Sequence, residues 1–178
     1  MADQPRIVTR DEQPYVAIAA TVTMDDIAAA ADRLPEVMAW VAARGLARAG
    51  APFFKYDVIA MPDRLQMQVG APLRELVEGE GDIVAGLLPA GRYAMVSHIG
   101  HPKELMGVTT DLLAWADRQG LAFDMTSSPD GERWGCRLEA YHSDPRLVPD
   151  MAQWHTDLLF RLAELAGPRL RSDGLAPP

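Results

Sequence analysis

The chain has 178 residues, of which 48% are hydrophobic and 24% are charged, and its formal net charge at pH 7 is −8. This composition is typical of a folded domain and excludes a disordered chain, while the acidic balance disfavours direct binding to nucleic acid or to anionic membranes. Cys136 is the single cysteine, which excludes an internal disulfide and a cysteine zinc cluster.

No targeting segment stands out in the sequence. No apolar run reaches the length of a transmembrane helix, and the first residues, MADQPRIVTRDEQP, lack the apolar core of a secretory signal. We therefore expect a cytoplasmic protein with no membrane contact. Its single domain is predicted over residues 14–165, between a flexible arm at 1–13 and a disordered tail at 166–178.

The first half of the chain predicts four strands and one helix. Segments rich in β-branched and aromatic residues, or alternating in polarity, indicate strands; they are residues 15–23, 53–60, 64–70 and 82–88. Apolar residues at helical spacing predict a helix from about Thr23 to Arg44. Pro35 lies inside that pattern, so the helix should kink or restart there.

The second half repeats this order. The expected strands are residues 92–99, 133–143 and 154–162, with a helix from about Pro102 to Gly120 and a loop at 124–131. Strand–helix–strand–strand thus occurs twice, in repeat 1 (about 14–71) and repeat 2 (about 91–163), and such units typically pair about a pseudo-twofold axis. We predict an α+β fold in which two pseudo-symmetric βαββ repeats form an antiparallel sheet, with helices on one face and a central ligand cleft on the other.

The segment RWGCRLEAYHSDP, residues 133–145, carries the most informative alternation. Successive side chains of a strand point to opposite faces. Cys136 and Leu138 belong to a small apolar row that we expect to lie under a helix. Arg137, Glu139 and Tyr141 point the other way, toward solvent or a ligand cleft.

Four parts of the sequence together resemble a known family. They are APFFKYDVIAMPDRLQMQVGAPL, GLLPAGRYAMVSHIG, the helix with LLAWADRQGL, and LEAYHSDP followed by WHTDLLFRL, spanning nearly all of residues 14–165. They resemble the GyrI-like small-molecule-binding domain, which is also the effector-binding domain of some AraC-type and MerR-type transcription regulators. The resemblance implies paired βαββ repeats around a cleft that takes lipophilic, often cationic, aromatic compounds.

The resemblance also implies which residues contact a ligand. An acidic residue on the penultimate strand meets the ligand's positive charge among aromatic side chains, and Glu139 holds that position here. The expected ligand contacts are Glu139, Tyr141, Tyr56, Phe54, Trp154, Phe160 and Gln68. Arg137 shares the strand face of Glu139, and an ion pair between them would weaken cation binding. Gln66 and Gln68 stand where relatives often carry acids.

Three functions remain open at this point. The first is a standalone binding protein that sequesters or senses lipophilic cations, since no helix-turn-helix precedes the domain. The second is a hydrolase of electrophilic compounds such as strained cyclopropanes, with Glu139 as acid or base and Tyr141 orienting water. The third is a protein partner of DNA gyrase or of a regulator, for which the family is named. We expect no cofactor and no metal, because His98 and His101 lack a third ligand nearby.

Overall fold

The computed structural model describes residues 1–165, and the predicted disordered tail lies outside them. The strands are β1 (Arg6–Arg10), β2 (Gln13–Val22), β3 (Phe53–Ala60), β4 (Arg64–Pro72), β5 (Ile83–Leu88), β6 (Gly91–Ile99), β7 (Met125–Ser128), β8 (Gly131–Trp134), β9 (Arg137–Tyr141) and β10 (His155–Arg161). The helices are α1 (Ile27–Ala31), α2 (Leu34–Ala43) and α3 (Leu105–Arg118), with short 3-10 helices η1 (Pro102–Glu104) and η2 (Met151–Gln153).

The sheet is built from two equivalent halves. Its main strand order is β1-β6-β10-β9-β3-β4-β2-β5, and each of these neighbouring pairs is antiparallel. The half β2-α1/α2-β3-β4 matches the half β6-α3-β9-β10, and the two halves join at β3 and β9. One extra strand extends each half, β5 beside β2 and β1 beside β6. The predicted α+β fold with two βαββ repeats is confirmed.

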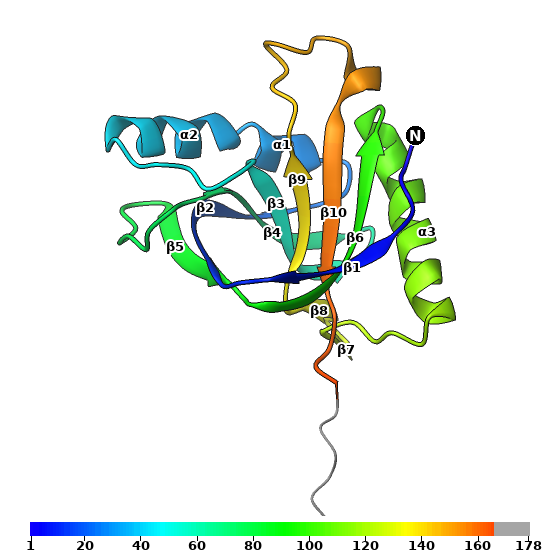
Figure 1. Ribbon diagram of the computed structural model, residues 1–178. Coiled ribbons are helices and arrows are strands. Elements are labelled where there is room, and N and C mark those ends of the chain that lie inside the picture. The colour runs from blue at the N-terminus through cyan, green and yellow to red at the C-terminus, as the bar shows by residue number, and fades with distance from the viewer. Residues whose placement is uncertain (166–178) are drawn as a thin grey trace, which may run out of the picture.

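The helices cover one face of the curled sheet, α1 and α2 over one half and α3 over the other (Figure 1). Val37 and Val41 of α2 are buried against β2 and β4, and Leu112 of α3 is buried against β6 and β10. The expected helix restart is present, because α1 and α2 are separate and Pro35 lies in the first turn of α2. Within residues 1–165, no helix is both long enough and apolar enough to cross a membrane.

A third buried cluster lies on the opposite face and contains residues from strands and their connections but none from a helix. Cys136 and Leu138 pack there with Phe53, Tyr93 and Leu159 inside the curl of the sheet. The expectation that the Cys136 row lies under a helix is therefore wrong. Alternation separates two faces of a strand, but when both faces are buried it does not tell which one a helix covers.

Two segments expected to be irregular are strands. Residues 6–10 form β1, which pairs with residues 91–95 of β6, so the N-terminal residues are not a loose arm. β1 covers the free backbone groups that β6 would otherwise expose at the sheet edge. Much of the expected loop at 124–131 belongs to the hairpin β7–β8, whose turn includes Gly131 at φ +115°.

The strand expected over residues 133–143 is interrupted. The chain passes from β8 to β9 at Gly135 and Cys136, and both strands pair with β3. A Cβ at Gly135 would lie 1.8 Å from a carboxylate oxygen of Asp124. A side chain at this position would displace the carboxylate of Asp124, so glycine allows the close approach at the break between β8 and β9.

Candidate functional site

A cleft of about 370 Å³ lies on the helix face, where the two halves of the sheet meet. Ile27 of α1 contributes to one side, and Leu105 and Met106 of α3 contribute to the other. The strands contribute Phe54, Tyr56, Arg137, Glu139 and Tyr141. The volume lies within the range of small-molecule sites, about 300–1,000 Å³.

The strand register places the acid at the centre of this seam. Glu139 of β9 is directly opposite Phe54 of β3 on one side and Leu158 of β10 on the other. On β3 the register shifts between Tyr56 and Val58, which makes Asp57 the extra residue of a β-bulge. A bulge bends a strand and changes the direction of nearby side chains. Tyr56 immediately precedes it and reaches across the seam to Glu139.

Two phenols hold the same carboxylate oxygen. The hydroxyl of Tyr141 donates to Oε2 of Glu139 at 2.5 Å, and the hydroxyl of Tyr56 donates to it at 3.1 Å. No hydrogen bond from the described residues reaches Oε1. The ring of Phe54 packs edge-on against Tyr141, with centroids 4.8 Å apart. One carboxylate oxygen is thus fixed by the protein, and the other is available to a ligand or water.

Burial controls the protonation of these groups. Burial raises the pKa of Glu139 above its ordinary value, and the hydrogen bonds from Tyr141 and Tyr56 and the nearby Arg137 offset only part of that effect. Burial, and then the neighbouring carboxylate, also raise the pKa of both tyrosines. Both phenols therefore remain protonated donors at neutral pH.

Arg137 is a second charge beside the cleft, held among aromatic rings. Its guanidinium carbon lies 4.5 Å from the ring centre of Phe160, 4.8 Å from that of Trp134 and 5.8 Å from that of Tyr56. Burial lowers its pKa, and its Nε is buried without a hydrogen-bond partner. Among the ion pairs of residues 1–165, none joins Arg137 to Glu139. The positive charge of Arg137 therefore lowers the pKa of Glu139 without forming an ion pair with its carboxylate.

The structure brings four of the predicted contacts together at the cleft: Glu139, Tyr141, Tyr56 and Phe54. The expectation that Trp154, Phe160 and Gln68 line it with them is wrong. The indole of Trp154 instead donates to the carbonyl of Val148 at 2.8 Å. Phe160 is fully buried in the core beneath α3, where it supports Arg137.

Gln68 lies on the opposite face of the sheet and acts there on the bulge. Its amide nitrogen donates to Asp57 at 2.8 Å, and its amide oxygen accepts from the hydroxyl of Tyr15 at 2.9 Å. Lys55, also on that face, pairs with Asp57. This network anchors the bulge at Asp57, which directly follows Tyr56, so Gln68 affects the cleft only indirectly.

The face on which the acid lies also differs from the expectation. A second hollow, of about 300 Å³, does exist on the face without helices, and Leu138 and Leu159 line it. Glu139 lies on the other side of the strand, in the cleft between the helices. Strand alternation correctly separated Glu139 from Leu138 but assigned the helices to the wrong side.

The helix-side lining was missed from the sequence. It includes Met24, Met61, Lys103, Met106 and Thr109. Met61 and Met106 are more than half exposed, although methionines are ordinarily interpreted as core residues. Flexible thioether side chains suit the rim of a site that takes ligands of several shapes. Their location at the cleft depends on tertiary packing, so it could not be predicted from the sequence.

Comparison with known proteins identifies the class of domain. The family model of the GyrI-like small molecule binding domain matches residues 3–163, and the chain belongs to this family. No curated protein matches the chain at a significant level. The family's description gives small-molecule binding as the general role of the domain.

Solved structures agree on the fold. The C-terminal domain of EcmrR has a TM-score of 0.70 at 16% identity over 91% of this chain and 98% of that domain. In the complex of EcmrR with DNA, the TM-score is 0.73 at 17% identity, over 91% of this chain and 58% of the EcmrR chain. This chain therefore spans little more than half of that regulator.

Two further proteins share the fold. SAV2435 bound to tetraphenylphosphonium has a TM-score of 0.62 at 9% identity, with 90% of this chain and 94% of that one covered. A hydrolase from Listeria innocua has a TM-score of 0.60 at 13% identity, with coverage of 90% and 92%. At these identities the likeness shows the fold alone.

The raised pKa of Glu139 predicts a pH-dependent cost to stability. Because the folded-state pKa lies above the unfolded value, the favourable contribution of this group is complete below about pH 4 and is lost as the pH rises through the folded pKa. Replacing Glu139 with Gln should therefore raise the free energy of unfolding relative to wild type, increasingly so from pH 4 to pH 8. Urea unfolding of both proteins across this range measures the difference.

Glu75→Gln is the matched control, because Glu75 is exposed and lies outside the cleft. It removes the same net charge, so its difference from wild type should change little with pH. A Glu139→Gln difference that is flat with pH, or that falls as pH rises, would contradict a raised pKa at Glu139.

Proposed function

We propose that the chain binds lipophilic, cationic aromatic compounds in the cleft between α1 and α3, and that it thereby sequesters or senses them. The observation that supports this most directly is the carboxylate of Glu139, which lines a largely apolar cleft and has one oxygen that accepts no hydrogen bond from residues 1–165. The alternating strand β9 and its pairing with β3 hold this oxygen in place.

Desolvation makes such a site selective for one kind of ion. A carboxylate in apolar surroundings has lost favourable hydration, and an arriving cation restores a charge partner at low dielectric. A small hydrated cation must lose its own hydration on entry, whereas a large delocalised cation loses little. The cleft therefore favours charge spread over aromatic groups.

Aromatic faces add to this selectivity. Phe54, Tyr56 and Tyr141 line the cleft on the strand side, and a desolvated cation near such a ring gains about 0.5–2 kcal/mol. Met61 and Met106 provide adaptable apolar contacts at the rim. The binding of tetraphenylphosphonium by SAV2435, which shares this fold, agrees with a ligand of this class.

Tetraphenylphosphonium should bind the chain, and Glu139→Gln should weaken binding about tenfold or more. The reason is the loss of one charge–charge attraction in a partly desolvated site, where such a pair is worth several kcal/mol at an effective dielectric of about 20. Isothermal titration calorimetry measures both affinities at one ionic strength.

Two controls separate a local charge effect from general ones. Glu75→Gln removes an exposed acid and should leave the affinity unchanged. Triphenylphosphine oxide, a neutral compound with the same aryl groups, should bind wild type and Glu139→Gln about equally. Equal weakening by both acid-to-amide variants, or no effect of Glu139→Gln on the cation, would refute the proposed role of Glu139.

Arg137 offers an independent test, because it places a competing cation beside the carboxylate. Replacing Arg137 with Met keeps an apolar side chain against Phe160 and Trp134 and removes the charge. Tetraphenylphosphonium should then bind about three- to tenfold more tightly, while triphenylphosphine oxide should not. A circular dichroism melt checks that the variant is folded, and unchanged or weaker cation binding by a folded variant would argue against the electrostatic account.

Hydrolysis of strained electrophiles is the second candidate, favoured by one feature of the site. A glutamate with a raised pKa next to two protonated phenols can exchange a proton with a bound molecule. In this reaction the water oxygen bonds to a ring carbon, the strained C–C bond breaks, and Glu139 passes the water proton to the departing carbon. Tyr141 would keep the carboxylate oriented.

Turnover distinguishes this candidate from binding alone. Incubation with an activated cyclopropane, followed by mass spectrometry, should yield more than one equivalent of ring-opened hydrate per protein, and Glu139→Gln should abolish the excess. Glu75→Gln serves again as the control. One equivalent of bound, unchanged compound would leave the binding function and exclude hydrolysis of that substrate.

A further inference from the structure

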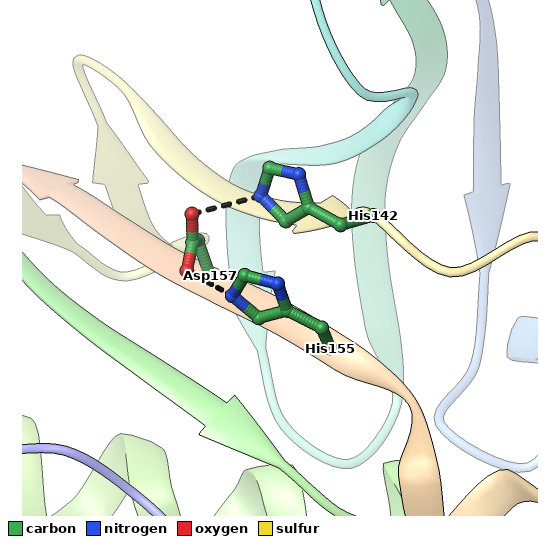
Figure 2. A group of neighbouring side chains, drawn as sticks. All are labelled: His142, His155 and Asp157. Carbon is green, nitrogen blue, oxygen red and sulfur yellow. Dashed lines mark hydrogen bonds and ion pairs between the residues drawn. The ribbon is translucent and has the colours of Figure 1, made fainter.

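A cluster of two histidines and one aspartate lies on the face of the sheet opposite Glu139. His142 directly follows β9, His155 opens β10, and Asp157 lies two residues further along β10 (Figure 2). The backbone N–H of His142 donates to the carbonyl of His155 at 3.0 Å, so the two histidines are neighbours across the strands. Their rings stack with centroids 4.5 Å apart.

Both imidazoles direct the same nitrogen at one carboxylate. Nε2 of His142 lies 2.8 Å from Oδ2 of Asp157, and Nε2 of His155 lies 3.1 Å from Oδ1 (Figure 2). One candidate ligand atom from each of the three residues lies within 4.8 Å of the others. In a tetrahedral site with bonds of about 2.0–2.1 Å, ligand atoms are separated by about 3.3 Å. The two His–Asp separations lie close to that value but end on different carboxylate oxygens. Binding one ion therefore requires the side chains to rearrange until the two imidazole nitrogens and the carboxylate surround it.

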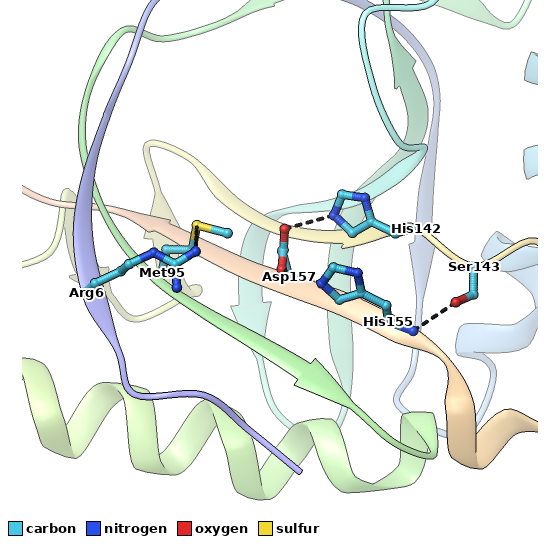
Figure 3. Close-up of polar contacts among 6 residues, drawn as sticks. All are labelled: Arg6, Met95, His142, Ser143, His155 and Asp157. Atoms are coloured by element: carbon cyan, nitrogen blue, oxygen red, sulfur yellow. Dashed lines mark hydrogen bonds and ion pairs between the residues drawn. The ribbon is translucent and has the colours of Figure 1, made fainter.

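The backbone and its partners hold the cluster in place. In the sheet, Asp157 is paired with Ala140 of β9 and Ser97 of β6. The hydroxyl oxygen of Ser143 accepts a hydrogen bond from the backbone N–H of His155 at 2.9 Å (Figure 3). The carboxylate of Asp157 is thus on the central strand β10. The imidazole of His142 follows the neighbouring strand β9, and the hydrogen bond from His155 to Ser143 joins the end of that strand to β10.

Burial divides the cluster into a buried anion and two accessible imidazoles. The side chain of Asp157 is 11% exposed, whereas those of His142 and His155 are 38% and 42% exposed. A buried carboxylate requires compensation by charge or hydrogen bonds. The exposed imidazoles allow an ion to reach that carboxylate from solvent without opening the core.

We propose that His142, His155 and Asp157 bind a divalent transition-metal ion, with Zn²⁺ the first choice. Two imidazole nitrogens and one carboxylate suit Zn²⁺ and its neighbours, whereas Mg²⁺ and Ca²⁺ prefer oxygen ligands alone. Three protein ligands leave a coordination position for water or a ligand. His142 and Asp157 also line the hollow of about 300 Å³ on this face, together with Leu138 and Leu159.

The open position would therefore be exposed to a second hollow, separate from the cleft of Glu139. Met95 of β6 lines that hollow, and its sulfur accepts from the guanidinium of Arg6 at 3.7 Å (Figure 3). Successive residues of β9 point to the two faces, Leu138 to the hollow and Glu139 to the cleft. The metal site is independent of the proposed cation-binding function.

Zinc titration of the full chain against a chromophoric chelator tests the site. Wild type should bind one Zn²⁺, and His142→Gln and His155→Gln should each weaken binding at least about hundredfold, because even the loss of an outer-shell partner costs 10–100-fold. His101→Gln is the matched control, since His101 lies outside the cluster, and it should bind as wild type does. Co²⁺ should give visible absorption bands of a four- or five-coordinate ion that both cluster variants lose.

Both cluster histidines are partly exposed, so their variants should fold, and circular dichroism confirms this. Asp157→Asn is an additional variant and should also lose the Co²⁺ bands. Zinc binding that is equal in His142→Gln, His155→Gln and His101→Gln would identify adventitious surface binding and overturn the proposal. Failure of wild type to compete with the chelator would also overturn it. Glu139→Gln should bind zinc as wild type does, because Glu139 is not part of the cluster. The zinc test therefore gives a result even if Glu139 proves not to bind cations in its cleft.

Discussion

The pairing of β3 with β9 is the constraint on which the rest of the structure depends. It joins the two repeats into one sheet and places Glu139 opposite Phe54 at the seam. The helices pack over the two outer parts of the sheet and leave the seam between them open as a cleft. A charged group in this apolar position lowers stability relative to a neutral one. Its presence in the cleft between the helices is therefore explained by the proposed binding function and not by a contribution to folding.

The two faces of β9 carry separate hollows, and a polar network on the face without helices supports one wall of the cleft on the other. On the helix face, Tyr56 reaches Glu139 because it precedes the bulge at Asp57. On the other face, Gln68 holds the carboxylate of Asp57 by a hydrogen bond. A polar network on one side of the sheet thus supports the bulge beside Tyr56, a phenol of the cleft on the other side. Polar networks whose members are fully bonded restrict a structure to one geometry, which suits a site whose acid needs both its phenol donors.

The sequence predicted the repeat, the break of the first helix at Pro35 and the grouping of Glu139, Tyr141, Tyr56 and Phe54, because these follow from local periodicity, turn residues and family resemblance. It did not predict the face that the helices cover, since both sides of β9 are buried. Nor did it predict β1, whose pairing with β6 joins residues far apart in the sequence. The whole cluster of His142, His155 and Asp157 was missed for a related reason. The pairing of β9 with β10 brings these residues together, whereas sequence spacing alone drew attention to His98 and His101.

The two repeats contribute different groups to the seam, a phenol from one and an acid from the other. Tyr56 and Glu139 lie on β3 and β9, the strands that join the two repeats, and each stands the same number of residues before a proline, Pro62 or Pro145. Had both positions carried acids, two carboxylates would face each other across the seam, and one would be forced to bind a proton. With a phenol in one repeat, that residue donates a hydrogen bond to the acid of the other. The two repeats thus supply the seam with one acid, of which one oxygen accepts from two phenols and the other has no hydrogen bond from the described residues. This arrangement agrees with the proposal of a monovalent cation as the ligand.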